Sequence, residues 1–443
     1  MKKNDRITVE CIDYTEDGAG VCRTDGLVVF VPGLIRGEKA EIGINKMKKN
    51  YGYGRIVNIL TPSQHRREPA CTANRLCGGC TLQHMDDSEQ RYFKENKVRN
   101  CFRQNAGMDP EILPILKVQP YERYRNKVQI PVQFNAGKTE MGFYQTHTNR
   151  IIPYEDCLVQ TELSNRIKKY FEKEITMLRN ASSIRHLLIK HAHRTGEVMA
   201  VIICREYPFH NSEALVNGLL EEFPQIASLS AIINKKETNV ILDGKEVLIH
   251  GRPYIEEELL GCRFRISARS FYQINPYATE ILYSKAVECA GLTGSEILID
   301  LYCGTGTIGM IASRKAKKVY GIEIVADAVK DAKINAQING IDNIEFFNMD
   351  ASKGAQAILR SKIKADVIIV DPPRKGCSKD TLDAMITISP GKIVYVSCDP
   401  ATLARDVKIL SEAGYELKTV QPVDMFPHTA HIETIVLLQK SNS

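Results

Sequence analysis

The chain has 443 residues, thirteen cysteines and a formal net charge of +6 at pH 7. Its charged content of 25% is typical of a globular protein, and no apolar run is long enough to cross a bilayer. The polar N-terminus carries no apolar export signal, so we expect a cytoplasmic location, reduced thiols and no membrane partner. Clustered cysteines in such a chain indicate metal binding or catalysis rather than a disulfide framework. The length predicts two to four domains.

Residues 1–60 are predicted to form a small β-barrel of the OB type. Turn signals at Asp17–Gly20 and at Pro32–Gly33 separate short strand-like runs. The runs with strand character are Arg6–Tyr14, Leu27–Val31, Glu38–Ile44 and Gly54–Leu60. Four or five short strands with glycine-rich turns are typical of OB barrels.

A basic window that contains tyrosines lies in and after this segment, because no acidic residue occurs between Glu41 and Glu68. Cations and stackable rings on one strand face are how small barrels hold single-stranded nucleic acid. The candidate RNA-binding residues are Lys46, Lys48, Lys49, Tyr51, Tyr53 and Arg55. The last four share one face at the two-residue period of a strand. The alternative is a solvated edge strand that lysines protect from pairing.

Residues 61–265 are predicted to be a central α+β domain, after a linker at Thr61–Ala70. A helix is expected at Asp86–Phe102, and part of 85–125 is expected to pack on the following domain. Strand-like runs occur at Lys127–Phe134, His186–Lys190 and Val198–Cys204.

Four cysteines of the central segment have the spacing of a metal site. They are Cys71, Cys77, Cys80 and the more distant Cys157. The sequence Cys77-Gly-Gly-Cys80 is well suited to chelation, and the spacing permits either zinc or an iron–sulfur cluster.

Residues 266–443 alternate strictly between strands and helices, which predicts a parallel sheet covered on both faces. The expected strands are Glu296–Tyr302, Lys318–Ile324, Asn343–Met349, Ala365–Asp371 and Lys392–Ser397. The expected helices are Ile308–Arg314, Val325–Asn339, Gly354–Leu359, Thr381–Ile388 and Ala401–Ala413. In such sheets ligands bind beyond the carboxyl ends of the strands.

A glycine-rich loop follows the first of these strands: Asp300-Leu-Tyr-Cys-Gly304-Thr-Gly306-Thr-Ile-Gly309. The loop fits the pattern G-x-G-x-x-G. Glu323 ends the next strand, at about the sequence separation from the glycines at which an acidic residue binds a ribose hydroxyl. Both NAD and S-adenosylmethionine (SAM) satisfy this pattern. Asp300 favours SAM, because an acid before the glycines suits a cationic amino-acid group better than a pyrophosphate.

A nucleophile and a base are predicted at the ligand edge of the same sheet. Cys398 ends the fifth strand at the start of a helix, where we expect a lowered thiol pKa. Asp371, stiffened by two prolines, ends the fourth strand, and Glu433 precedes a final apolar strand. A thiolate that adds to carbon 6 of uracil activates carbon 5 for methylation, and a base then removes the carbon 5 proton.

These segments together resemble the 23S rRNA (uracil-5-)-methyltransferases that carry a TRAM domain. The resemblance covers essentially the whole chain and includes Ser270-Phe-Tyr-Gln-Ile-Asn275. It implies a TRAM barrel, a Rossmann-like SAM-dependent methyltransferase domain, and a [4Fe-4S] cluster on the four cysteines. It also implies that Asp371 lies near the methyl group, that Cys398 is the nucleophile and that Glu433 is the base. The implied SAM contacts are Gln273, Tyr302, Gly304, Gly306, Thr307 (where some members have Asn), Glu323, Asp350 and Asp371.

The same resemblance implies 23S rRNA as the partner, and we expect a monomer. Two alternatives remain open. One is a tRNA uridine-5 methyltransferase, which is less favoured because such enzymes typically lack the barrel and the cysteine cluster. The other is an iron–sulfur RNA-binding assembly factor with an inactive transferase domain. The sequence does not indicate which uridine is modified.

Overall fold

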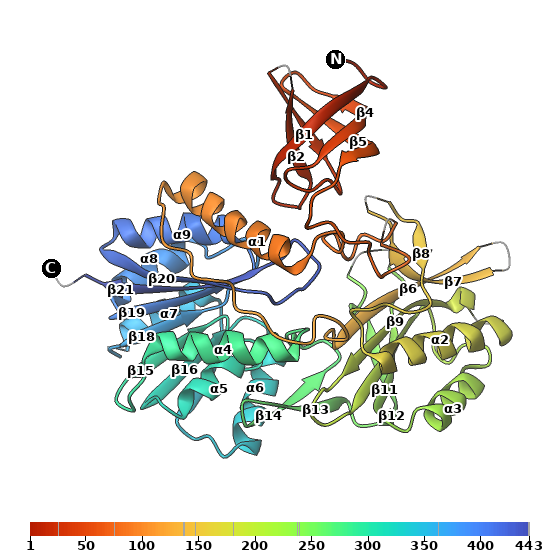
Figure 1. The fold of residues 1–443 in the computed structure, drawn as a ribbon. Coiled ribbons are helices and arrows are strands. Elements are labelled where there is room, and N and C mark those ends of the chain that lie inside the picture. The colour runs from red at the N-terminus through yellow and green to blue at the C-terminus, as the bar shows by residue number, and fades with distance from the viewer. Residues whose placement is uncertain are drawn as a thin grey trace.

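The computed structural model describes residues 1–24, 26–74, 76–135, 138–146, 148–179, 181–236, 238, 240–361 and 363–441. Figure 1 shows a β-barrel at the N-terminal end above two larger bodies, each built on a twisted sheet. The predicted boundaries 1–60, 61–265 and 266–443 stay a prediction. Among the described residues, no helix combines the length and the apolar character needed to cross a membrane.

The N-terminal barrel is closed, with the strand order β1-β2-β3-β5-β4. Its strands are β1 (Arg6–Tyr14), β2 (Gly20–Thr24), β3 (Leu27–Val31), β4 (Lys39–Met47) and β5 (Tyr51–Thr61). The predicted barrel is therefore confirmed, although β2 is not among the predicted strands. A side chain at Gly20 would come within 2.7 Å of the Cys11 sulfur, so glycine permits the close pairing of β1 and β2.

The last two barrel strands are longer than predicted, and this changes the place of one candidate residue. β4 continues to Met47 and β5 already begins at Tyr51. Lys49 therefore lies in the turn between the strands and not on the strand face predicted for it. Tyr51, Tyr53 and Arg55 do share one exposed face, because Gly52 and Gly54 point into the barrel.

The central segment forms a seven-stranded sheet with the order β12-β11-β10-β9-β6-β7-β8. Its strands are β6 (Lys127–Asn135), β7 (Lys138–Tyr144), β8 (Ile151–Pro153), β9 (Ile184–His191), β10 (Val198–Cys204), β11 (Ile226–Ile233) and β12 (Lys245–Gly251). The helices α2 (Glu162–Met177) and α3 (Ser212–Glu222) pack on it (Figure 1). A separate hairpin, β13 (Tyr254–Leu259) and β14 (Cys262–Ser267), leads to the C-terminal sheet.

The C-terminal sheet has the strand order β17-β16-β15-β18-β19-β21-β20. Its strands are β15 (Ile297–Leu301), β16 (Lys318–Glu323), β17 (Ile344–Asn348), β18 (Val367–Val370), β19 (Lys392–Ser397), β20 (Tyr415–Val423) and β21 (Glu433–Lys440). Its helices are α4 (Pro276–Ala290), α5 (Thr307–Ser313), α6 (Ala326–Ile338), α7 (Ala351–Arg360), α8 (Lys379–Ile388) and α9 (Pro400–Glu412). Neighbouring residues of β18, such as Ile368 and Ile369, enter different hydrophobic cores, so both faces are covered as predicted.

The predicted parallel pairing is confirmed for the five predicted strands, and the sheet has two further strands that are not part of the parallel set. β15 to β19 pair in parallel, but β21 pairs antiparallel with both β19 and β20. β20 follows α9 without being predicted, because its start carries Glu416, Lys418 and Thr419 rather than a continuous apolar run. Because β21 runs antiparallel to β19, the first residue of β21 lies at the edge of the sheet where β19 ends.

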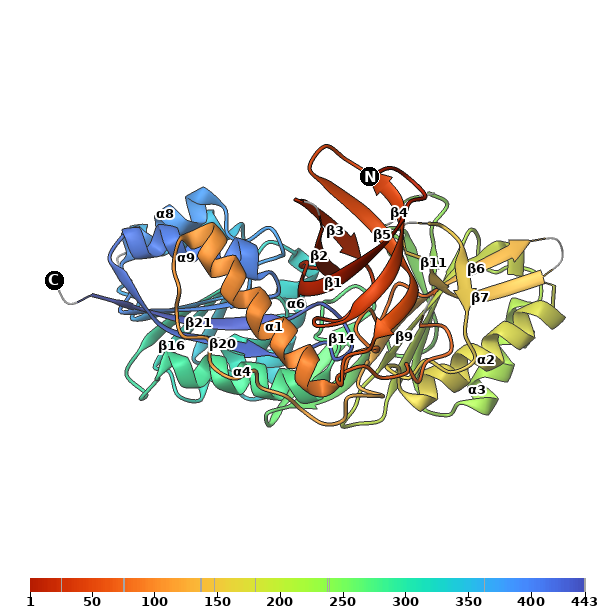
Figure 2. The ribbon, with the colours of Figure 1, turned by 45° about the horizontal axis from the view of Figure 1, so that its top comes forward.

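The helix α1 (Asp87–Cys101) connects the barrel to the C-terminal sheet. It continues into a short π-helical turn, and Val98 and Phe102 join the hydrophobic core beneath α9 and β20. On its other side, Glu89 accepts a hydrogen bond from the Tyr14 hydroxyl at 2.6 Å and pairs with Arg36 at 3.2 Å. Figure 2 shows α1 lying along the C-terminal domain, beside the barrel.

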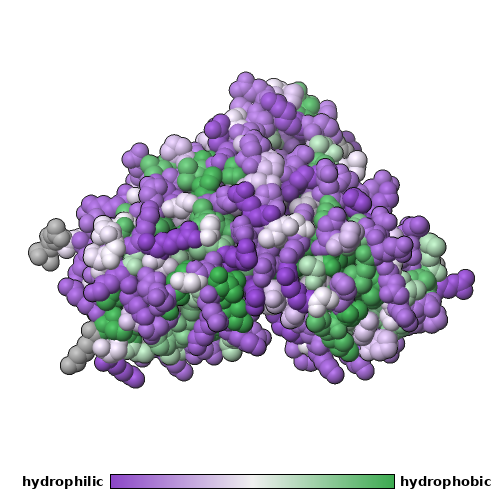
Figure 3. Space-filling view, turned by 90° about the horizontal axis from the view of Figure 1, so that it is seen from below, coloured by the Kyte–Doolittle hydropathy of each residue, from purple (hydrophilic) through white to green (hydrophobic). Residues whose placement is uncertain are grey.

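Figure 3 shows one face of the molecule as two lobes with a notch between them. Hydrophilic residues prevail on this face, and the hydrophobic ones are gathered in separate patches rather than in one continuous band.

Candidate active site

The carboxyl edge of the C-terminal sheet brings the predicted catalytic residues together. Asp371 directly follows β18, and Cys398 directly follows β19. β21 runs the opposite way and pairs Thr434 with Ser397, so Glu433 and Cys398 are the next residues on adjacent strands. Three residues from distant parts of the sequence thus meet at one edge.

The Cys398 thiol does not have the lowered pKa that its position suggested. Burial and the nearby charges of Glu433 and Asp371 raise its pKa to about 11. The start of α9 offers the thiol little compensation, because Asp399 accepts hydrogen bonds from the amides of Ala401 and Thr402, each at 3.0 Å. This cap occupies the free amides, and its carboxylate offsets the positive end of the helix dipole.

Several buried carboxyl groups lie at this edge of the sheet and have a raised proton affinity. Burial raises the pKa of Asp371 to about 7 and that of Asp300 to about 8. Glu433 is 3% exposed, and burial together with the charge of Asp371 raises its pKa well above the ordinary value. The Arg374 cation acts to lower the pKa of Glu433 and that of Cys398, so it partly offsets both increases. An edge with this excess of buried carboxyl groups suits a ligand with a positive charge.

A narrow cavity lies over the end of β15 and holds several of the predicted SAM contacts. Its lining includes Gln273, Tyr302, Gly304, Thr307 and Asp371. Asp300, 1% exposed, uses one carboxyl oxygen to accept a hydrogen bond from the Gly309 amide at 2.8 Å. Its other oxygen is buried without a hydrogen-bond partner in the described chain, so it fits a ligand that donates a hydrogen bond.

Three predicted SAM contacts do not line this cavity. Gly306 is packed against Phe346, where a side chain would come within 2.6 Å of the ring, so glycine is needed for the turn itself. Glu323 accepts hydrogen bonds from the amides of Gly304 and Val325, and it thereby fixes the loop. Asp350 caps α7. Their contacts with SAM stay a prediction.

Asp300 provides a pH-dependent prediction. A carboxyl group with an unfolded pKa near 3.9 and a folded pKa of about 8 keeps its proton only in the folded state between those values. Stability in the absence of ligand therefore falls as pH rises through this window, by at most about 1.4 kcal/mol per pH unit. We expect Asp300→Asn to flatten the dependence of the thermal midpoint on pH between pH 5 and 8. Equal slopes for the variant, for wild type and for the exposed control Asp383→Asn would contradict this.

The loop that precedes Glu433 is held from several directions. The Lys94 ammonium of α1 donates hydrogen bonds to Asp424 at 2.5 Å and to the carbonyl of Phe426 at 3.0 Å. Lys97 donates to the carbonyl of Ala430 at 2.9 Å and also to the carbonyl of Glu16 in the barrel at 2.9 Å. One helix therefore fixes both the barrel and the loop that leads to the predicted base, Glu433.

Removal of the Lys94 charge should destabilise the fold. Lys94 is fully buried, so Lys94→Met leaves the Asp424 carboxylate buried without its partner. We expect a loss of about 3 kcal/mol in the free energy of unfolding, measured by urea denaturation. The exposed Lys408 of α9 is the matched control, and Lys408→Met should change stability by less than about 0.5 kcal/mol. Equal effects of the two substitutions would show that the buried pair contributes nothing.

Several residues at this site escape prediction from the sequence. Arg374 acts on both Cys398 and Glu433, and the only sequence signal for it is its place directly after the two prolines. Thr279 and Tyr283 of α4 also line the cavity, but in the sequence they read as ordinary helix and core residues. Tyr272 lines it too, within the segment 270–275, of which only Gln273 is predicted to contact SAM.

The barrel presents an aromatic cluster on its exposed face. Tyr51 is 37% and Tyr53 is 42% exposed, and their ring centroids lie 5.7 Å apart. Phe30 of β3 lies 5.7 Å and 5.8 Å from the two rings, and the sequence does not predict its part in the cluster. Lys46 pairs with Tyr53 across β4 and β5, and Arg55 donates a hydrogen bond to Asn45. The predicted cations and rings are thus adjacent, and their contact with RNA stays a prediction.

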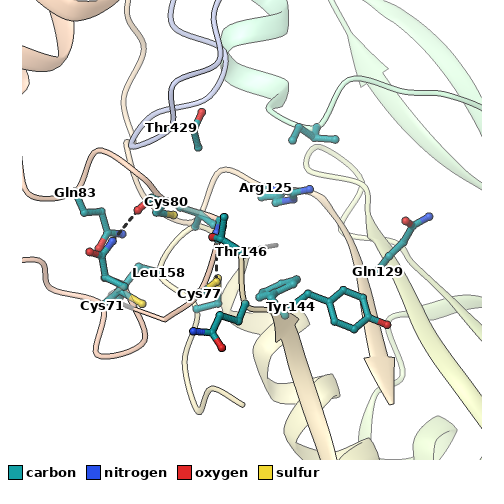
Figure 4. Close-up of a pocket in the computed structure, with 18 of the residues that line it drawn as sticks. Cys71, Cys77, Cys80, Gln83, Arg125, Gln129, Tyr144, Thr146, Leu158 and Thr429 are labelled. Carbon is teal, nitrogen blue, oxygen red and sulfur yellow. Dashed lines mark hydrogen bonds between the residues drawn. The ribbon is translucent and has the colours of Figure 1, made fainter. Parts of the chain in front are cut away.

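The four cysteines of the predicted cluster line one cavity, shown in Figure 4. All are free thiols, and burial raises the pKa of Cys80 to about 12 and also raises that of Cys77 and Cys157. Four thiols are a donor set that suits an iron–sulfur cluster. Within the described ranges, however, no three His, Cys, Asp or Glu side chains lie close enough to share one metal ion.

The fold as a whole is that of a methyltransferase. It matches a crystal structure of a tRNA (uracil-54, C5)-methyltransferase from Pyrococcus abyssi, in complex with S-adenosyl-L-homocysteine, with a TM-score of 0.77. The match covers 98% of this chain and 100% of that chain, at 24% sequence identity. Fold and site together define a Rossmann-like methyltransferase joined to an N-terminal barrel.

Residues 88–441 match the family described as tRNA (Uracil-5-)-methyltransferase, and residues 4–57 match the TRAM domain. The chain therefore belongs to the tRNA (uracil-5-)-methyltransferase family, and it is a SAM-dependent RNA methyltransferase. An uncharacterized RNA methyltransferase of Clostridium tetani is 41% identical over 99% of this chain and 97% of its own length. One from Listeria monocytogenes is 42% identical over 99% of this chain and 98% of its own length.

Proposed function

We propose that this enzyme transfers a methyl group from SAM to carbon 5 of a uridine in 23S rRNA, through a covalent adduct of Cys398. The main support is the register between β19 and β21, in which the residues next to Cys398 and Glu433 pair. The unpartnered oxygen of Asp300 and the buried carboxyl groups around it suit the cationic methyl donor.

In the proposed reaction, the Cys398 thiolate adds to carbon 6 of the uracil and leaves an enolate at carbon 5. SAM supplies the methyl group that carbon 5 accepts. Glu433 then takes the proton from carbon 5, the bond between sulfur and carbon 6 breaks, and the free thiolate is restored. The raised pKa of Glu433 makes its carboxylate a stronger base for this step. The nearby carboxylates disfavour ionisation of the Cys398 thiol, whereas the Arg374 cation favours it. We therefore assign Arg374 a supporting role in thiolate formation.

A target uridine must leave its base stack to reach the edge of the sheet. The rings of Tyr51 and Tyr53, together with Lys46, Lys48, Lys49 and Arg55, are proposed to bind a single-stranded part of the same RNA.

The barrel alone does not separate an rRNA enzyme from a tRNA enzyme, contrary to our expectation. The Pyrococcus abyssi protein named for tRNA matches 98% of this chain, and that share includes barrel residues. The proposal of 23S rRNA therefore rests on the four-cysteine set and on the resemblance of the whole chain. A tRNA substrate is the alternative, and the test has to include both RNAs.

The substrate can be identified by mapping 5-methyluridine in 23S rRNA and in tRNA from cells with and without this protein. We expect at least one 5-methyluridine of 23S rRNA to disappear and to return with the wild-type gene but not with Cys398→Ala. Loss confined to tRNA would favour the alternative substrate. The inactive assembly factor would be favoured if purified protein transferred no labelled methyl group from SAM to either unmodified RNA.

We propose that Cys71, Cys77, Cys80 and Cys157 hold a [4Fe-4S] cluster with a structural role. The support is that all four thiols line one cavity. Anaerobically purified protein should contain iron and acid-labile sulfide in equal amounts, and Cys80→Ser should lose both while Cys289→Ser keeps them. Wild-type protein with zinc or with no metal would contradict the cluster.

A further inference from the structure

The cavity of the four cysteines extends from the central sheet toward the proposed active site. Its volume is about 830 Å³. Thr429, from the loop before Glu433, and Ile274, next to Gln273, line one side. In Figure 4, Arg125 lies between Thr429 on one side and Tyr144 on the other, with the cysteines beside them. The cavity is therefore lined in part by the loop before Glu433 and by the segment that contains Gln273.

Two cations, Arg125 and Lys127, line this cavity. Arg125 lies just before β6 and Lys127 is its first residue; both line the cavity, whereas Asn126 between them is buried. Neither forms an ion pair within the part of the chain that the structure describes, and no Asp or Glu is among the described residues that line the cavity. The Arg125 charge also acts on His431, two residues before Glu433. An uncompensated positive surface of this kind fits an anion near the catalytic loop.

The remaining lining supplies groups that recognise a nucleobase. Tyr144, at the end of β7, is 46% exposed and can offer its ring face to a base. Gln129, Gln145 and Asn149 line the same space with amide groups that donate and accept hydrogen bonds. Cations, an exposed ring and side-chain amides are the combination by which proteins bind unstacked nucleotides of RNA.

We propose that this cavity binds an unpaired nucleotide of the substrate RNA next to the target uridine. Arg125 and Lys127 would hold its phosphate, and the Tyr144 ring would stack on its base. This inference rests on the proposed function, because Thr429 of the loop before Glu433 and Ile274 beside Gln273 line the cavity. It assigns substrate recognition to the central domain in addition to the barrel.

The cysteine site provides the competing explanation for the two cations. A thiolate-bound cluster is anionic, and Arg125 lines the same cavity as the four cysteines. If the cations only balance that charge, their removal affects metal content and leaves RNA binding unchanged. The two explanations therefore predict opposite results for the same variants.

The test measures binding of a short oligouridylate to full-length protein at several salt concentrations. Log affinity falls as log salt rises, and Arg125→Gln/Lys127→Gln should make this fall less steep, by about 0.7 in slope for each lost phosphate contact. Tyr144→Ala should weaken binding roughly tenfold, and Tyr144→Phe should restore it. A 4-thiouridine in the oligonucleotide should crosslink to the peptide that contains Tyr144. The control Lys364→Gln/Lys408→Gln removes two exposed charges elsewhere and should change little.

Wild-type affinity and salt slope in the Arg125→Gln/Lys127→Gln variant would overturn the proposal. So would loss of iron from that variant with RNA binding intact. The charge-conserving variant Arg125→Lys/Lys127→Arg controls for misfolding and should bind like wild type. Oligouridylate binding does not require turnover, so a wild-type enzyme that fails to methylate RNA would contradict the proposed function alone.

Discussion

Replacement of Cys398 by alanine is expected to reduce methyl transfer by about 10⁶-fold, to below detection, while SAM still binds. Without the thiolate, carbon 5 of the uracil is not activated and cannot take the methyl group. Cys398 follows β19, whereas the residues that line the cavity over β15 belong to other segments. SAM affinity should therefore change less than twofold. Transfer of tritiated methyl groups to unmodified RNA measures the first quantity, and calorimetric titration with SAM measures the second.

Two other cysteines serve as controls for this experiment. Cys303 lines the cavity over β15, and Cys289 is half-buried on α4. Cys303→Ala tests whether a small volume change near SAM lowers activity, and Cys289→Ala tests for a general effect of thiol loss. Both variants should keep most of the activity. Substantial methylation by Cys398→Ala would exclude it as the nucleophile.

Glu433→Gln is expected to stop the reaction after the methyl group has been transferred. The amide keeps the shape of the side chain but cannot accept the carbon 5 proton, so elimination of the thiolate slows by roughly 10²- to 10⁴-fold. The covalent complex between enzyme and RNA should accumulate and be visible as a shifted band under denaturing conditions. Methylated RNA should be released at a correspondingly lower rate.

The matched control for Glu433 is its neighbour. Thr434 is also buried, and its hydroxyl has no hydrogen-bond partner in the described structure. Thr434→Val should therefore turn over normally without an accumulated complex. Rapid release of methylated RNA by Glu433→Gln would assign the proton transfer to another group.

The parallel core of the C-terminal domain could be predicted from the sequence because its strands are short, apolar and separated by helices. β19, for example, has the predicted bounds Lys392–Ser397. Polar residues interrupt the apolar pattern of β2 and β20, so the sequence does not predict these two strands. They form because they pair with neighbouring strands. The turn at Lys48–Asn50 follows from the register in which β4 pairs with β5, and this register cannot be predicted from the spacing of residues in the sequence.

The members of the active site could be proposed from motifs, but their electrostatics could not. The position of Cys398 before a helix predicts a low thiol pKa, yet Asp399 caps that helix and two buried carboxyl groups oppose ionisation. These groups come from β18 and β21, so only the folded sheet brings their charges to the thiol. The contacts of Lys94 and Lys97 with the catalytic loop likewise join residues more than three hundred positions apart.

Mass spectrometry of the adduct formed with 5-fluorouridine RNA tests the central claim most directly. Fluorine at carbon 5 cannot leave as a proton does, so the methylated base should remain bound to the sulfur that attacked carbon 6. Wild-type enzyme with SAM and fluorinated RNA should give one adduct on the peptide that contains Cys398, and Cys398→Ala should give none. An adduct that persists in Cys398→Ala, or that maps to Cys303 or Cys377, would contradict the account.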